Sequence, residues 1–183
     1  FVEPAELLRE YRTTRFPERF YNLKIGIPWA DTTNLVEVSD VLRCCGDYGI
    51  SEQTKSERCT MGVDTGKQLH VVISHFQPDG NGVRQVLFIG AVQDYGDLDR
   101  LMQRFHVSTC VIDALPEIHA TRAFAARHHG KVWLNYFMES QRGSYNWRRD
   151  ERIVQENRTE ALDASRQLIR DRKIVLPRSL PIV

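Results

Sequence analysis

Residues 59–76 read CTMGVDTGKQLHVVISHF, and this stretch decides the fold. A short apolar run ends on Asp64, the turn TGK follows, and a second apolar run begins almost at once. Two strand-length apolar runs joined by so short a turn predict an antiparallel hairpin. A carboxylate at the end of a buried strand is unfavourable unless something pairs with it. Asp64 therefore either caps a turn or holds a cation.

The stretch that follows extends the hairpin into a meander. Residues 83–92 form a third apolar run, and the intervening QPDGNG contains Asp-Gly and Asn-Gly pairs, which are strong hairpin signals. We therefore expect strands over 59–64, 68–76 and 83–92, each antiparallel to the one before it.

Beyond this meander the pattern changes to helices alternating with single strands. GDLDRLMQRFH has helical spacing, with Asp97 as the expected N-cap, and STCVID at 108–113 is a short apolar strand. A helix follows, with Pro116 in its first turn and Gly130 at its end, and 131–137 forms another strand. Because helical crossovers join these last strands, they should be parallel. The predicted order is β-β-β-α-β-α-β, an α/β fold with a mixed central sheet flanked by helices.

The two ends of the chain are read more simply. Residues 1–58, with short helices expected at about 4–12 and 37–46, form a lead-in that packs on a main domain at 59–183. Near the end, RIVQE is a possible short strand, and Asn157 with Glu160 forms a capping box for a further helix. The chain opens without Met, so we expect it to be a domain of a longer protein.

Composition excludes several functional classes. The 183 residues carry a formal net charge of only +1, so any nucleic-acid surface must be a local patch. The four cysteines, Cys44, Cys45, Cys59 and Cys110, include no CxxC pair, which argues against common zinc sites and a disulfide framework. No apolar stretch is long enough to span a membrane, so we expect no membrane partner.

Two aspartates end neighbouring strands of the predicted sheet. Asp64 ends the first strand, and Asp113 ends the strand at 108–113. Because these strands should be adjacent at the sheet centre, their carboxylates should lie side by side, where they repel unless a cation separates them. Hard oxygen ligands on rigid strands suit Mg²⁺ or Mn²⁺. A single aspartate at a strand end is more often a turn former, but a matched pair favours metal binding.

These motifs, in this order, resemble a known family. YNLKIGIPWAD, CTMGVDTGKQLHVVI, CVIDALPE, QENRTEALDA and IVLP together span most of the chain. They resemble the C-terminal nuclease domain of the large terminase subunit of tailed phages, which belongs to the ribonuclease H-like superfamily.

The resemblance implies a specific activity and setting. It implies a Mg²⁺- or Mn²⁺-dependent endonuclease with two ions in the complete site, cutting concatemeric viral DNA during packaging in the host cytoplasm. Asp64 and Asp113 would be catalytic as metal ligands. The partners implied are double-stranded DNA, an upstream ATPase domain of the same protein, the portal and the small terminase subunit. These residues contain no GxxxxGK[ST] phosphate loop, so the chain itself should not hydrolyse ATP.

One departure from the family concerns the third metal ligand. The resemblance implies a further acid in an Asp-His-type motif after the LP segment, and no such motif occurs before Val183. Asp163, within EALDA, is a weak candidate to replace it.

Candidate DNA contacts come from basic residues in turns. The segment after residue 140 interleaves arginines with Tyr145 and Trp147, as expected of a surface that binds phosphates. A solvated loop is the equal alternative. The expected DNA-binding residues are Lys67, Arg84, Arg142, Arg148, Arg149 and Arg152.

Two other functions stay open. One is another ribonuclease H-like nuclease of the junction resolvase or transposase type. The other is a non-catalytic module that binds DNA or a protein and keeps only the fold.

Overall fold

The computed structural model describes residues 3–14, 20–27, 35–51, 58–77, 81–141, 143 and 145–178. The chain forms two compact units, Phe1–Glu37 and Val38–Val183. The expectation of a lead-in that ends at residue 58 stays a prediction about domain organisation.

The first unit contains helix α1 (Pro4–Thr13) and a π-helical turn, η1 (Tyr21–Ile25). Aromatic contacts join the two elements. The ring of Tyr11 lies 5.4 Å from that of Phe20 and 5.9 Å from that of Tyr21, between centroids. Phe20 is buried, so an aromatic cluster is the core of this small unit.

The second unit is built on one eight-stranded mixed sheet with the order β6-β7-β5-β4-β1-β2-β3-β8. Its strands are β1 (Cys59–Asp64), β2 (Leu69–Phe76), β3 (Arg84–Val92), β4 (Val107–Asp113), β5 (Val132–Phe137), β6 (Asn146–Arg148), β7 (Ile153–Glu156) and β8 (Ile174–Val175). Its helices are α3 (Val38–Arg43), α4 (Tyr95–Arg104), α5 (Ile118–Arg127) and α6 (Arg158–Arg170).

The pairing of the strands confirms the predicted topology. Strands β1, β2 and β3 form the antiparallel meander, and β4 pairs in parallel with both β1 and β5. Strand β7 adds in parallel beside β5, and β6 pairs antiparallel to β7. Strand β6 was not expected, because its exposed residues show no apolar alternation. The tip of the predicted QPDGNG hairpin, residues 78–80, lies outside the described residues.

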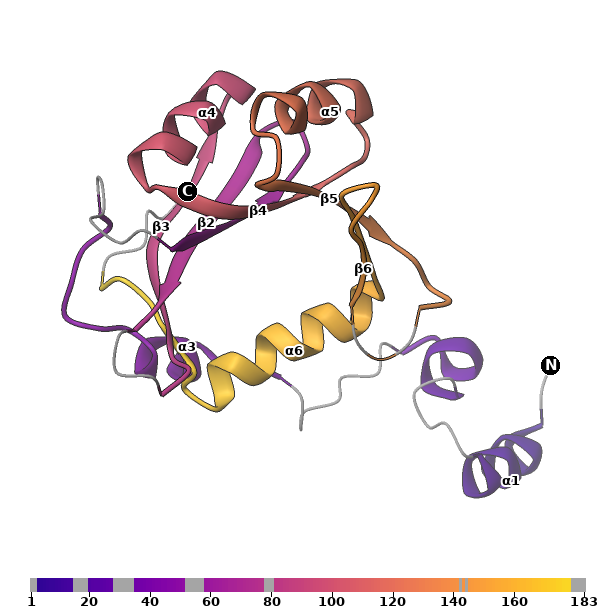
Figure 1. Cartoon of the computed structure of the whole chain (residues 1–183). Coiled ribbons are helices and arrows are strands. Elements are labelled where there is room, and N and C mark those ends of the chain that lie inside the picture. The colour runs from indigo at the N-terminus through magenta and orange to yellow at the C-terminus, as the bar shows by residue number, and fades with distance from the viewer. Residues whose placement is uncertain are drawn as a thin grey trace. The chain divides into compact units, whose positions relative to one another are not determined.

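The two faces of the sheet are covered differently. Helices α4 and α5 lie over one face, and α6 crosses the other (Figure 1). Leu98, Leu101 and Met102 on α4 are buried against the sheet, whereas α6 buries none of its residues. Within the described part of the chain, no helix combines the length and apolar character needed to cross a membrane.

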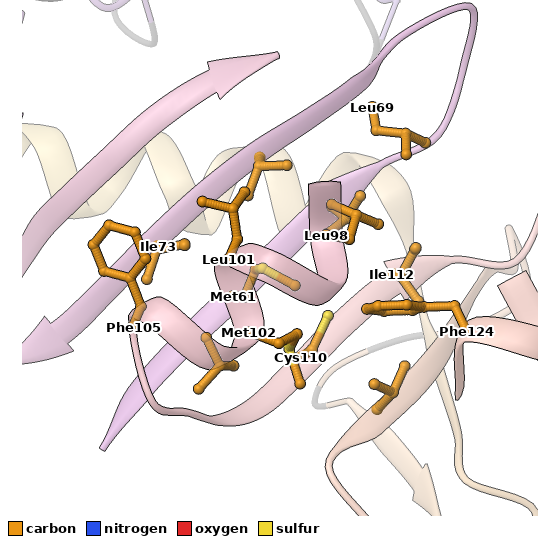
Figure 2. Close-up of a cluster of buried hydrophobic side chains, with 14 of the residues drawn as sticks. Met61, Leu69, Ile73, Leu98, Leu101, Met102, Phe105, Cys110, Ile112 and Phe124 are labelled. Atoms are coloured by element: carbon orange, nitrogen blue, oxygen red, sulfur yellow. The ribbon is translucent and has the colours of Figure 1, made fainter. Parts of the chain in front are cut away.

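The main core lies between the sheet and the helices α4 and α5. Figure 2 shows α4 side chains and Phe124 of α5 meeting Met61, Ile73 and Ile112 of the strands. Cys59 and Cys110 are fully buried here, and burial raises the pKa of the Cys110 thiol. A second, smaller cluster joins Cys44 to the other end of the sheet.

The N-cap of α4 corrects a sequence prediction. Asp94, not Asp97, caps the helix: its carboxylate accepts a hydrogen bond from the Asp97 backbone N–H at 2.9 Å. The Asp97 carboxylate in turn accepts from the Gln93 backbone N–H at 3.2 Å. The Asp97 side chain thus reaches back to the residue before the cap, as in a variant of the capping box. The spacing of apolar residues did not reveal which aspartate begins the helix.

The start of α5 is a second correction. Pro116 lies before the helix rather than in its first turn, and the Leu115–Pro116 peptide bond is cis. The helix ends at Arg127, and Gly130 follows in a turn with φ of +86°. That backbone conformation favours glycine, which explains the stop signal seen in the sequence.

The packing predicts that the core between the sheet and the helices α4 and α5 contributes most to the free energy of unfolding. Phe124→Ala removes a fully buried ring and should lower the free energy of unfolding by about 3–5 kcal/mol. Phe76→Ala is the matched control, because Phe76 is 53% exposed, and it should change the free energy by less than about 1 kcal/mol. Urea unfolding followed by circular dichroism measures both. Equal losses in the two variants would contradict this assignment of the core.

Candidate functional site

The structure places Asp64 and Asp113 side by side. Strands β1 and β4 are parallel neighbours, and Val63 pairs with Ile112, so the next residue of each strand is an aspartate at the same edge. Alternation along the strands sends Met61 and Val63 into the core and leaves the Asp64 side chain on the opposite, exposed face. The two carboxyl groups line the same cavity and are close enough for Asp64 to raise the pKa of Asp113.

The surroundings make a second negative charge unfavourable at this point. Burial raises the pKa of the Asp113 carboxyl, and the neighbouring Asp64 raises it further. A hydrogen bond from Asn135 and the positive charge of Arg158 act in the other direction without reversing the shift. The pair is therefore an electrostatically strained site, and a cation would relieve its repulsion.

Asn135 on β5 is the backbone neighbour of Asp113. The two residues pair directly across the parallel strands, and Asn135 Nδ2 donates a hydrogen bond to Asp113 Oδ1 at 3.1 Å. Asn135 is only 5% exposed, and its Oδ1 atom has no hydrogen-bond partner. The sequence analysis did not find this residue, since an isolated asparagine within an apolar strand gives no signal.

Glu156 is a second residue that the sequence analysis missed. It is the last residue of β7, and because β7 runs parallel to β5 its side chain reaches the same edge as the two aspartates. Burial raises the pKa of the Glu156 carboxyl, a hydrogen bond from Asn135 lowers it, and the charge of Asp113 raises it. In the sequence, the feature that could have indicated Glu156 is its position at the end of a possible strand, directly before the helix cap Asn157.

These groups line one cavity of about 640 Å³. It lies between the exposed face of the sheet and α6, and strands β1 to β5, β7 and α6 all contribute to its walls. The lining combines apolar residues of the strands and α6 with several polar ones. The polar lining comprises Asp64, His70, Asp113, Asn135, Glu156, Arg158 and Ser165.

The described residues contain no group of three or more His, Cys, Asp or Glu side chains arranged to hold one ion. Asp163, the weak candidate for a third acid, does not line the cavity and pairs with Arg166 on α6 at 2.9 Å. Asp64 and Asp113 line this cavity together, and their role as metal ligands stays a prediction.

The arginines before β7 lie around a second cavity of about 440 Å³, lined by Trp133, Trp147, Arg149 and Arg152. The rings of Trp133 and Trp147 meet edge to face at 4.8 Å, and the Arg152 guanidinium lies 5.1 Å from the Trp133 ring centroid. Trp133 and Asn135 are two residues apart on β5, so their side chains leave the same face of the sheet. This aromatic and basic cavity and the acidic one therefore share a face.

The other predicted DNA contacts are scattered. Lys67 is exposed in the turn after Asp64. Arg84 lies at the opposite end of the sheet, where its guanidinium covers the Phe76 ring at 4.4 Å. Arg148 pairs with Glu151, and Arg142 lies outside the described residues. The structure groups only Arg149 and Arg152 in one cavity, and DNA binding by the whole set stays a prediction.

Solved structures share this arrangement of strands and helices. The whole chain aligns with the large terminase of bacteriophage HK97 at 16% identity, covering 42% of that protein, with a TM-score of 0.57. This chain has the fold of part of a large terminase. It spans about two fifths of the HK97 protein's length, and the predicted fold, a mixed central sheet flanked by helices like that in a large terminase, is confirmed.

Two further structures match less well. The large terminase nuclease of the thermophilic phage G20c aligns over 76% of this chain and 73% of its own, at 10% identity and a TM-score of 0.47. The large terminase of the thermophilic bacteriophage D6E aligns over 96% of this chain and 41% of its own, at 12% identity and 0.46. No protein-family model and no curated protein sequence matches the chain.

The strain at Asp113 predicts a gain in stability when its charge is removed. A carboxyl whose pKa is raised by folding destabilises the folded state as pH rises through that pKa. In chelator, Asp113→Asn should therefore raise Tm at pH 7 by about 2 °C or more, since 1 kcal/mol shifts Tm by roughly 2–4 °C at this size. The gain should vanish at acidic pH, where Asp113 is protonated. Differential scanning calorimetry measures both.

Asp99 provides a control of opposite sign. Burial alone would raise its pKa, but hydrogen bonds from Arg127 and His128 hold the pKa of Asp99 below its usual range. Asp99→Asn should lower Tm at pH 7, by an amount that shrinks as pH falls through that lowered pKa. If both variants lower Tm at pH 7, the Asp113 carboxylate is not strained.

Proposed function

We propose that this chain is a metal-dependent DNA endonuclease domain that cuts concatemeric viral DNA during genome packaging. The observation that carries the proposal is the pair of carboxylates, Asp64 and Asp113, at adjoining parallel strand ends within a fold shared with a large terminase. Two like charges held together at the rim of a cavity are a costly arrangement that a bound cation would make favourable.

The donor atoms suit a hard divalent cation. Asp64 and Asp113 offer carboxylate oxygens from rigid strands, which fits Mg²⁺ or Mn²⁺, and the described lining of the cavity includes no thiol and one imidazole, that of His70. Such ions, two in the complete site, would supply charge neutralisation and an activated nucleophile for phosphodiester hydrolysis. Asp64 and Asp113 act as ligands in this proposal, not as general bases.

The remaining residues of the cavity have supporting roles. Gly62 lies on the same strand face as Asp64, and a side chain there would meet nothing within 4 Å, so the sheet leaves open space for a nucleic-acid backbone. The charge of Arg158 reaches Asp113, which places a cation at the rim where a phosphate would approach. Arg158 is exposed and therefore accessible to substrate.

The DNA path continues over the cavity of Trp133, Trp147, Arg149 and Arg152. Arginine and aromatic side chains on the same sheet face as the acids suit contact with the phosphate backbone. Since such contacts carry little sequence information, the preference for any sequence should be slight. Within a longer protein, an upstream ATPase domain, the portal and the small terminase subunit are the proposed partners, in the host cytoplasm.

Cleavage of plasmid DNA tests the proposal. With Mn²⁺, the protein should nick and then linearise supercoiled DNA, and Asp64→Asn or Asp113→Asn should reduce the rate at least about 100-fold, as expected for loss of a metal ligand. Asp163→Asn is the matched control, because Asp163 is an exposed acid in an ion pair on α6, and it should keep full activity.

The alternative functions give different results in the same assay. Cleavage of four-way junctions in preference to linear or supercoiled DNA would indicate a resolvase-type nuclease instead. If the wild-type protein binds DNA but cuts none of these substrates with Mn²⁺ or Mg²⁺, the nuclease proposal is wrong and the chain is a binding module.

The proposed DNA path makes a separate prediction. Arg149→Gln and Arg152→Gln should each weaken binding to double-stranded DNA and reduce the slope of log K against log[salt] by about 1, because each loses one phosphate contact. Arg100→Gln, an exposed arginine on α4 over the opposite face, should leave both quantities unchanged. Fluorescence anisotropy at several salt concentrations measures the slopes. Equal slopes in all variants would place the DNA elsewhere.

A further inference from the structure

Asn135 occupies a position that packing alone does not explain. It is 95% buried in the centre of β5, on the sheet face that carries the acids rather than the face that carries the core. The adjacent residue Leu134 points into the main core, as alternation requires. An apolar residue at 135 would fill this site without any need for hydrogen bonds. The presence of an amide therefore indicates that its polar atoms have partners to bind.

The amide nitrogen of Asn135 holds one of the acids in place. Nδ2 donates a hydrogen bond to Asp113 Oδ1 at 3.1 Å. Because β4, β5 and β7 are consecutive parallel strands, Asn135 lies on the strand between those that carry Asp113 and Glu156. All three side chains line the same cavity.

The amide oxygen has the opposite property, because it has no partner. Native proteins rarely leave a buried acceptor unsatisfied without a reason, because the hydrogen bonds that it loses from water are not replaced. Asn135 lines the cavity that contains Asp64, Asp113 and Glu156. The unpaired Asn135 Oδ1, which lies in a cavity with carboxylates, would not bind an anion but can coordinate a cation.

We propose that Asn135 belongs to the cation site: its Nδ2 positions Asp113, and its Oδ1 supplies a further protein oxygen to the ion. This inference rests on the proposed function, since it assumes that Asp64 and Asp113 hold Mg²⁺ or Mn²⁺. It adds a residue of β5 to the two aspartates of β1 and β4.

Calorimetric titration with Mn²⁺ alone, on the full chain without DNA, tests the assignment. Wild-type protein should bind Mn²⁺, and Asp113→Asn should abolish binding. Asn135→Ala should weaken binding about 10- to 100-fold, the range expected when a group that orients metal ligands is removed. Asn135→Asp keeps an oxygen but loses the N–H donors, so its affinity should exceed that of Asn135→Ala.

Leu134→Ala is the matched control for loss of stability. It removes a buried side chain from the same strand on the opposite face, so it should lower Tm while leaving the Mn²⁺ affinity unchanged. A role of Asn135 in stability alone would give the same pattern for Asn135→Ala, with lower Tm and wild-type affinity, and would overturn the inference.

The remaining outcomes separate this inference from the proposed function. If wild-type protein binds no Mn²⁺, or binds it equally well after Asp113→Asn, the cation site itself is refuted and the inference fails with it. If Asp113→Asn abolishes binding but both Asn135 variants bind like wild type, only the inference fails. If Asn135→Asp binds as weakly as Asn135→Ala, the assignment of Oδ1 to the ion is wrong.

Discussion

The parallel pairing of β1 with β4 is the constraint on which the rest of the site depends. Parallel strands in register end at the same edge, so two aspartates far apart in the sequence meet without any loop having to place them. The buried residues that alternate with them, Met61 and Val63 on β1 and Cys110 and Ile112 on β4, fix both strands against α4 and α5. Because the core is closely packed, the two strands cannot shift to move the carboxylates apart, and the repulsion between them remains.

The central part of this arrangement could be predicted from the sequence, because each step had a local signal. Apolar runs of strand length, short glycine turns and helical spacing gave the order of the elements, and that order implied which strands would be neighbours. The start of α4 was predicted three residues too late, because Asp94 and Asp97 are both good N-cap residues. Only the structure shows that Asp94 caps the helix. Pro116 likewise suits either a helix start or the turn before it.

Asn135 and Glu156 could not be predicted, because their importance depends on where β7 lies. The segment between β5 and β7 is irregular and contains β6, whose exposed residues resemble a loop in sequence. Nothing local indicates that β7 adds in parallel beside β5, and without that pairing Glu156 is only an acid before a helix. Single-sequence patterns report periodicity within an element, whereas these two residues gain their role from contacts between elements that are distant in the chain.

The way α6 is held has a consequence for access to the cavity. Its first turn is fixed by Asn157, whose side chain accepts from the Glu160 N–H and donates to the Glu139 carbonyl, and Ile169 near its other end packs on the small cluster around Cys44. Between these two anchors the helix buries no side chain, while Ala161, Leu162 and Ser165 form a wall of the cavity. Little apolar packing therefore holds the middle of α6 against the sheet, whereas the acidic edge opposite rests on the main core.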